Sequence, residues 1–272
     1  MKKILLLINN YEMQDHVMHF VSRLAKIENV KINCLFLGRL KPDEGEEGRI
    51  FPGTINSGDQ YLTKETNADQ RQHPEKYQVK KIEDFFKAEG LSFYTQIVLK
   101  NYLDVIVNET NFADLVVGDK DLNVLHFSMN SFISLSQCPV FLVPENSLFF
   151  DEVILTYDGQ LSSIHAMKLF TYLFPWCGTK KTFLISVLPD NILQMEYDAL
   201  VKEWFLLHYH NGQVVVLRGN AKSEIIQFIN QQKNTLVVMG AFGRSALSRL
   251  FKESLALPIL EKTSAPVFIS HL

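Results

Sequence analysis

Two pairs of alike segments constrain the fold of this chain more than any other feature of its sequence. Residues 111–118, NFADLVVG, align with residues 233–240, KNTLVVMG. Residues 136–143, SQCPVFLV, align in the same way with residues 263–270, TSAPVFIS. Matched blocks at corresponding places in two halves indicate an internal duplication. We therefore expect two domains that share one topology.

Short apolar runs alternate with stretches of helical periodicity in both halves. Strands are expected in the first half at residues 3–8, 30–37, 93–99, 113–118 and 139–143, and helices at 15–27, 74–89, 102–109 and 122–136. The second half has expected strands at 153–157, 182–188, 214–217, 235–239 and 266–269, and helices at 163–173, 196–209, 221–231 and from Ser254 onward. Strands that alternate with helices predict an α/β fold with parallel sheets.

The pattern restarts after a junction at residues 144–150, so the expected domains are 1–145 and 151–272. Residues 41–73 interrupt the first domain with glycine, proline and polar residues and few large apolar ones. This composition predicts a long surface loop or a partly disordered insertion. A lid and a docking loop are the alternatives for its role.

Composition excludes several classes of function. The 272 residues are 47% apolar with a formal net charge of −3, which gives no support to nucleic-acid binding. Cysteines 34, 138 and 177 are widely spaced and odd in number, as in proteins of a reducing compartment. The apolar run at 4–8 is shorter than the core of a signal peptide, and no run reaches the roughly 20 residues of a membrane span. A cytoplasmic protein that binds no membrane is expected.

One stretch has the features of a phosphate-binding loop. The apolar run 235–239 leads to Gly240 and Gly243, then to Arg244 and to Ser254, where a helix is expected. Glycines let backbone N–H groups approach a ligand, and a helix start offers N–H groups that lack partners. The alternative is a tight turn without a ligand. The motifs GxSxG, HExxH, CxxC and GxxxxGK[ST] do not occur, so no catalytic or metal-binding residues are predicted.

Taken together, these residues resemble the universal stress protein family in its tandem, two-domain form. The resemblance rests on Asp158 after the first strand of the second half, on residues 218–225, on the spacing of Gly240, Gly243 and Ser254, and on residues 265–269. It implies a five-stranded parallel sheet of order 3-2-1-4-5, flanked by helices, in each domain. Open sheets of this kind bind ligands where the strand order reverses.

The resemblance also implies a ligand and partners. It implies a regulatory or stress-protective protein that binds an adenine nucleotide, ATP with Mg²⁺ or Mn²⁺, and is not an enzyme, with slow ATP hydrolysis left open. Asp158 and Val187 would lie near the ribose and adenine, and Gly240, Gly243, Arg244 and Ser254 near the phosphates. It further implies that the two fifth strands, 139–143 and 266–269, pair within the chain as a pseudo-dimer. A homodimer is a further expectation.

Departures from the family pattern favour a second hypothesis, a scaffold or partner-binding protein without a ligand. Glu253 stands where the motif has glycine, and a carboxylate about 4 Å from a phosphate charge costs roughly 4 kcal/mol at an effective dielectric constant near 20. In the first half, Asn9 or Asn10 replaces Asp158, Asp121 replaces the second glycine, and Ser131-Phe132 replaces the final pair. That half is expected to lack a phosphate site. Asp158 itself has an alternative role as the cap of the following helix.

Overall fold

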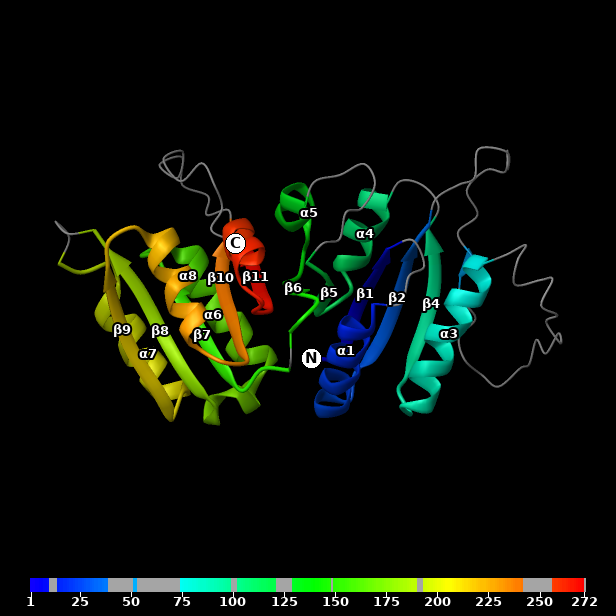
Figure 1. Cartoon of the computed structure of the whole chain (residues 1–272), viewed down its shortest axis with the longest axis horizontal. Helices are drawn as coiled ribbons and strands as arrows, with labels where there is room; N and C mark the ends of the chain where they lie inside the picture. The colour runs from blue at the N-terminus through cyan, green and yellow to red at the C-terminus, as the bar shows by residue number, and fades with distance from the viewer. Residues whose placement is uncertain are drawn as a thin grey trace. The chain divides into compact units, whose positions relative to one another are not determined.

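The computed structural model describes residues 1–9, 14–38, 51–52, 74–98, 102–120, 129–147, 149–189, 193–241 and 256–271. Contacts divide the chain into two compact units. The N-terminal unit holds Met1–Phe132 and Ser136–Cys138, and the C-terminal unit holds Ile133–Leu135 and Pro139–Leu272. Figure 1 shows the course of the chain from blue at the N-terminus to red at the C-terminus.

The N-terminal unit is built on a parallel sheet with strand order β4-β2-β1-β5. These strands are β1 (Lys3–Asn9), β2 (Lys31–Leu37), β4 (Phe93–Val98) and β5 (Leu115–Asp119). The helices are α1 (Asp15–Glu28), α3 (Pro74–Ala88), α4 (Tyr102–Thr110) and α5 (Met129–Leu135), the last divided between the units. The α/β fold that the sequence predicts is confirmed.

Central strands of this sheet are buried on both faces, which explains their uninterrupted apolar sequences. Residues 4–8 of β1 are at most 3% exposed, and residues 32–37 of β2 at most 1%. The latter run includes one polar side chain, Asn33, which is 0% exposed. A buried amide is costly unless it is hydrogen-bonded, so its partners matter.

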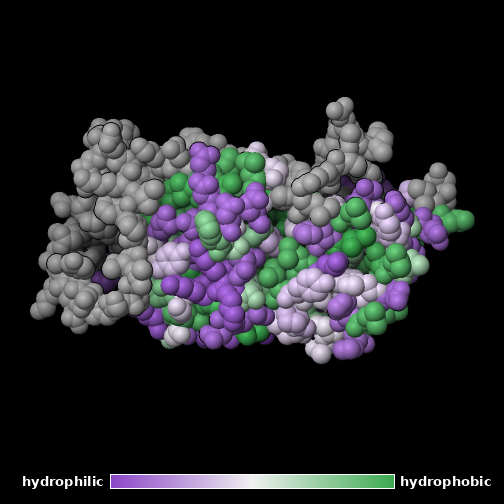
Figure 2. All heavy atoms as spheres, turned by 180° about the vertical axis from the view of Figure 1, so that it is seen from behind, coloured by the Kyte–Doolittle hydropathy of each residue, from purple (hydrophilic) through white to green (hydrophobic). Residues whose placement is uncertain are grey.

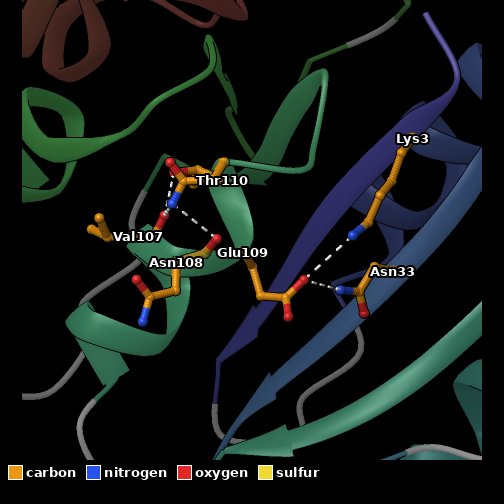
Figure 3. A network of polar contacts seen from close by, with 7 residues as sticks. Lys3, Asn33, Val107, Asn108, Glu109 and Thr110 are labelled. Carbon is orange, nitrogen blue, oxygen red and sulfur yellow. Dashed lines mark hydrogen bonds and ion pairs between the residues drawn. The ribbon is translucent and has the colours of Figure 1, made fainter.

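Asn33 is satisfied by a polar network near the amino ends of β1 and β2 (Figure 3). Its Nδ2 donates to Glu109 Oε2 at 3.1 Å, and Lys3 Nζ donates to the same oxygen at 3.4 Å. Burial alone would lower the pKa of Lys3, but Tyr94 and Glu109 outweigh it and raise that pKa. The network joins the last turn of α4 to two strands. It lies at the edge of the sheet opposite to the strand ends where a ligand is expected, so its role is structural.

The C-terminal unit contains five parallel strands in the order β9-β8-β7-β10-β11. They are β7 (Glu152–Tyr157), β8 (Lys181–Leu188), β9 (Asn211–Arg218), β10 (Thr235–Ala241) and β11 (Val267–His271). The helices are α6 (Leu161–Leu173), the 3-10 helix η1 (Pro175–Thr179), α7 (Asp198–His208), α8 (Ala221–Gln231) and α9 (Ala256–Lys262). Numbered along this half, the order is 3-2-1-4-5, as expected.

A sixth strand, β6 (Val140–Val143), extends the sheet of the C-terminal unit. It pairs antiparallel with β11, and Phe141 lies opposite Phe268. Phe141 is fully buried, and its ring lies 6.1–6.4 Å from those of Phe150, Phe174 and Phe268. The pairing of the two fifth strands that the sequence predicts is therefore observed. The division by contacts falls before β6, whereas the repeat pattern places the junction after it.

Several elements differ from the sequence-based expectations. Within the predicted insertion, β3 (Phe51–Pro52) pairs antiparallel with β4, and the rest of 41–73 lies outside the described residues. The N-terminal unit therefore has the order 3-2-1-4 with an added short strand, and its expected fifth strand, β6, belongs to the other unit. The strand expected at 214–217 extends to Asn211–Arg218. Of the helix expected at 122–136, residues 129–135 are helical, and 121–128 lie outside the described residues.

Candidate functional site

The strand order of the C-terminal unit reverses between β7 and β10, which is where an open α/β sheet offers a crevice. The printed register of this pair runs from Glu152 opposite Thr235 to Leu155 opposite Val238. Both strands continue beyond those positions. Thr156 follows Leu155, and its buried hydroxyl donates to the Val238 carbonyl at 3.0 Å. The hydrogen bond from the Thr156 side chain thus connects β7 and β10 just beyond their printed backbone pairing, next to the carboxyl ends of both strands.

Asp158 lies at the carboxyl end of β7 with its side chain exposed. Its Oδ1 accepts a hydrogen bond from Gln160 N at 3.0 Å, which closes a turn before α6 begins at Leu161. Gly159 between them has a φ of +83°, a conformation that residues with side chains rarely adopt. Asp158 therefore has a local structural role. Its Oδ2 accepts no hydrogen bond from the described residues, so the exposed carboxylate still has an acceptor for a ligand.

Gly240, near the carboxyl end of β10, packs against the backbone of the first turn of α6. A Cβ at this position would lie 2.5 Å from Ser162 C and from Ser163 N. Real Cβ atoms do not approach backbone atoms this closely, so the contact requires glycine. Helix and strand packing therefore explains Gly240 without a ligand. The same packing brings the N-terminus of α6 to the crevice, where its unpartnered N–H groups favour an anion.

A segment that the sequence does not point to lies over the end of β7. The Met195 side chain is 3.6–3.8 Å from the Cβ position of Gly159. The hydroxyl of Tyr157 donates a hydrogen bond to the backbone carbonyl of Glu196. Burial, followed by the nearby acidic side chains, raises the pKa of Tyr157 to about 12, so this hydroxyl remains a donor at neutral pH. Residues 195 and 196 thus form one wall of the crevice.

The other predicted site residues divide into two groups. Val187 is 8% exposed and follows Ser186, the β8 residue opposite Tyr157, so it lies at the same edge of the sheet as Asp158. Gly243, Arg244 and Ser254 lie outside the described residues, as does Glu253. Their roles toward a phosphate stay predictions.

In the N-terminal unit, the equivalent place holds a histidine and a carboxylate. His16, in the first turn of α1, has its Nε2 2.6 Å from Asp119 Oδ2 at the end of β5. The two side chains are 15% and 7% exposed. Phe132, which replaces the last residue of the motif, is fully buried, and Asn10 and Asp121 lie outside the described residues. The pair joins α1 to β5, and sequence spacing could not reveal it because the two residues are far apart in the chain.

Other features of the described residues lie away from the crevice. A cavity of about 120 Å³ lies at the amino ends of β10 and β11, beside Asn146, Asn234 and Ser264. Within the described ranges, no group of three or more His, Cys, Asp or Glu side chains could hold a metal ion. The ring centroid of His208 lies 4.9 Å from that of Trp204. Burial raises the pKa of the Cys138 thiol to about 12, so this thiol is not a reactive thiolate at neutral pH.

A comparison with protein families matches residues 195–271 to the universal stress protein family. The C-terminal part of the chain is similar to the universal stress protein family. The matched residues run from Met195, in the wall of the crevice, to the end of β11. They include Gly240 and the whole of 242–255, and the resemblance noted in the sequence is thereby confirmed.

Solved structures show that the universal stress protein fold extends beyond the matched segment. A universal stress protein from Archaeoglobus fulgidus DSM 4304 has a TM-score of 0.68 and 14% identity, with 98% of this chain and 96% of that chain covered. A functionally unknown protein from Pseudomonas aeruginosa PAO1 has a TM-score of 0.62 and 14% identity, with 99% and 92% covered. At 14% identity, the similarity to these two structures establishes the fold alone. The comparison with curated proteins gives no match.

None of the described helices combines the length and the apolar character that a membrane span needs.

Proposed function

We propose that the C-terminal unit binds an adenine nucleotide, ATP with Mg²⁺ or Mn²⁺, in the crevice between the carboxyl ends of β7 and β10. The observation that carries the proposal is the meeting of an exposed carboxylate, Asp158, with the tightly packed Gly240 and the start of α6 at the reversal of strand order. A carboxylate can accept hydrogen bonds from ribose hydroxyls, and a helix start favours phosphate. The match of residues 195–271 to the universal stress protein family supports the same reading.

Roles follow for the residues at the site. Asp158 Oδ2 accepts from the ribose, because Oδ1 is already used by Gln160 N. Val187 and Met195 provide the apolar side of the crevice. Gly243, Arg244 and Ser254 contact the phosphates. On this proposal the protein is regulatory or stress-protective and cytoplasmic, and it performs no catalysis.

The second candidate is a scaffold that keeps the fold and binds a protein partner without a nucleotide. The wall formed by Met195 and Glu196 favours it, because side chain and backbone occupy space beside Asp158. Glu253 favours it too, because a carboxylate beside phosphates is repulsive. These two features favour the scaffold, whereas the family motif favours nucleotide binding. A binding measurement therefore distinguishes the two functions.

Isothermal titration of the full chain with ATP and MgCl₂ tests the proposal. We expect heat of binding that Asp158→Ala reduces about tenfold or more in affinity, since a hydrogen bond to a charged group contributes roughly 1.5–3 kcal/mol. Asp151→Ala is the matched control, because this exposed acid precedes β7 at the opposite edge of the sheet. Glu253→Gly should strengthen binding. No heat and no thermal shift at millimolar ATP for wild type and for Glu253→Gly would leave the scaffold as the function.

A further inference from the structure

The strand β9 is an edge of the C-terminal sheet with little cover. It pairs with β8 along its whole length, and in the part of the chain that the structure describes no strand lies on its other side. Each of its residues is exposed or half-buried, although 214–217 is the apolar run VVVL. Val214 is 37% exposed and Val216 is 45% exposed. An apolar strand with an open row of N–H and C=O groups is a template for pairing with another strand.

Among the residues that the structure describes, β9 has none of the usual protections of an edge strand. Proteins commonly guard such strands with proline, lysine, a bulge or a covering segment. The sequence of β9, NGQVVVLR, has no proline and no lysine, and its register with β8 is continuous over eight residue pairs, so it has no bulge. In the N-terminal unit, by contrast, the outer strand β4 pairs with β3, which contains Pro52. The open edge of β9 is therefore suited to a partner.

The exposed valines share a face with helix α7. A Cβ on Gly212 would lie 2.7 Å from the ring of Phe205, a buried residue of α7, so Gly212 faces that helix. Alternate residues of a strand point the same way, which places Val214 and Val216 on this side too. The helix adds three exposed leucines, Leu200 at 64%, Leu206 at 59% and Leu207 at 71%. On the right-hand side of Figure 2, apolar groups in green reach the surface of the C-terminal unit among polar ones.

We propose that two copies of this chain form a symmetric dimer by antiparallel pairing of their β9 strands. The paired edge and the side chains Leu200, Leu207, Val214 and Val216 make up what we call the β9–α7 surface. A two-fold axis through Val215, perpendicular to the sheet, keeps the α7 side of both copies on one face. It sets Val214 of one copy opposite Val216 of the other, and the reverse. Pairs of β-branched side chains in such positions stabilise an antiparallel ladder.

The charge of Arg218 favours the antiparallel orientation of two copies over a parallel one. Arg218 is the charged residue of β9 and stands at its carboxyl end. In the antiparallel register the two copies of Arg218 lie about 20 Å apart, since each residue of a strand spans roughly 3.3 Å. That distance exceeds the Debye length of about 8 Å at physiological salt, so their repulsion is screened. A parallel arrangement would place them about 4.8 Å apart on neighbouring strands. A symmetric antiparallel contact is also self-closing, so it ends at a dimer.

The ladder alone is too small for a stable dimer, which commonly buries about 800 Å² on each partner. Leu200 and Leu207 of α7 supply further apolar area, because they lie seven residues apart and so share one flank of a helix that covers the face of the paired valines. The chain already contains one antiparallel junction of edge strands, between β6 and β11. The proposed dimer repeats that solution at the opposite end of the C-terminal sheet, and it does not depend on nucleotide binding.

Sedimentation equilibrium of the full chain over a wide range of concentration tests the proposal. We expect a monomer–dimer equilibrium that Val216→Lys and Val214→Lys each shift toward monomer by about tenfold or more in dissociation constant, since each places a charge in a paired position. Tyr172→Lys is the matched control, because Tyr172 is a 62% exposed apolar residue of α6 outside the β9–α7 surface. It should leave the equilibrium unchanged. A wild-type chain that is monomeric throughout, or a dimer that survives both valine substitutions, overturns the proposal.

A cysteine placed on the two-fold axis tests the register. Val215→Cys sets two thiols opposite each other across the axis, at the separation of directly opposed residues, and should give a disulfide-linked dimer under mild oxidation. Gln213→Cys is two residues away and should not crosslink. Native Cys34 and Cys177 are buried, and the half-buried Cys138 is replaced by serine in both variants so that it does not compete. Crosslinking at 213 in place of 215, with folding of both variants verified by circular dichroism, contradicts this register.

Discussion

At the scale of single residues, the lack of a side chain at Gly240 has two explanations. The family motif assigns it to a phosphate, and the structure places it against the backbone of α6. The packing explanation makes a prediction without any ligand. Gly240→Ala should destabilise the protein by about 1–3 kcal/mol, because the new Cβ forces backbone to shift in a packed region. Urea unfolding of the nucleotide-free protein measures this.

The control for Gly240→Ala is Ser264→Ala, an exposed position where the change should stay within about 0.5 kcal/mol. Equal unfolding midpoints for both variants would refute the packing explanation and leave the ligand as the reason for the glycine. A loss of stability in the apo protein would show that Gly240 is required by the fold, whatever it binds.

His16 and Asp119 are the residue pair that most distinguishes the N-terminal unit. Their side chains are 15% and 7% exposed, so solvent screens the pair weakly. We expect a coupling free energy of about 1–3 kcal/mol between His16→Ala and Asp119→Ala in a double-mutant cycle. Urea unfolding of the two single variants and the double variant provides the measurement.

An ion pair at the surface provides the reference for the coupling free energy of His16 and Asp119. Lys26 and Glu89 lie 2.6 Å apart with side chains 53% and 33% exposed, and their coupling should be smaller than that of a pair shielded from solvent. If the His16–Asp119 coupling is no larger than this reference, the pair is not the tie between α1 and β5 that its burial indicates.

At the scale of elements, the sequence predicts what is buried better than what is exposed. The strands β1, β7 and β10 are apolar runs buried on both faces, and their positions follow from the sequence within about two residues. The strand β9 begins with Asn-Gly-Gln and is half exposed, so its first three residues carry no apolar signal. The position of residues 195 and 196 beside the crevice could not be predicted from the sequence either. It depends on packing of the Met195 side chain against Gly159 and on a hydrogen bond from Tyr157 to the Glu196 carbonyl, and neither contact produces a sequence pattern.

The candidate site also contains some features that the sequence predicts and others that it does not. Asp158 and Gly240 could be predicted because a parallel sheet fixes where its strands end, and the structure brings both to the crevice. The expected role of Asp158 as a helix cap is not what the structure shows, because Gln160 is the N-cap of α6 and Asp158 Oδ1 instead accepts from Gln160 N in the turn before the helix. The collision that excludes a side chain at Gly240 depends on the distance between two elements, which no local pattern encodes.

The bond from Tyr157 to Glu196 gives the wall of the crevice a pH dependence. Burial raises the pKa of Tyr157 from near 10 in the unfolded chain to about 12. A raised pKa contributes stability that is fully present below pH 10 and is lost as the pH rises through 12. Tyr157→Phe removes the donor and should cost about 1 kcal/mol at pH 8. Phenylalanine cannot ionise, so the variant should match or exceed wild type in stability by pH 12.

Guanidinium unfolding at a series of pH values, with the difference between wild type and Tyr157→Phe as the reported quantity, checks this. Changes common to both proteins cancel in that difference. A difference that stays constant from pH 8 to pH 12 would show that Tyr157 ionises equally in the folded and unfolded chains, and the buried hydrogen bond would then have to be abandoned.

At the scale of the whole molecule, the repeat pattern and the contacts disagree about one strand. The pattern assigns β6 to the first domain, because it is the fifth strand of the first repeat. The contacts place it in the C-terminal unit, paired with β11 and packed through Phe141. Both statements are consistent with a duplication in which one repeat supplies an edge strand to the sheet of the other. The two divisions of the chain predict different fragments that fold by themselves.

Two fragments decide between them. Residues 139–272 keep β6, and residues 151–272 follow the boundary of the repeat. We expect the longer fragment to be more stable by at least about 3 kcal/mol, because removing Phe141 alone leaves a cavity beside Phe174 and Phe268. The shorter fragment also uncovers the edge of β11, an apolar strand prone to association. Phe141→Ala within 139–272 separates the two effects, since it opens the cavity and keeps the edge paired. We expect this variant to be less stable than the parent fragment 139–272 but not to aggregate, whereas sedimentation velocity should reveal aggregation of 151–272. If the fragments 139–272 and 151–272 are equally stable and sediment equally, β6 is not part of the C-terminal folding unit.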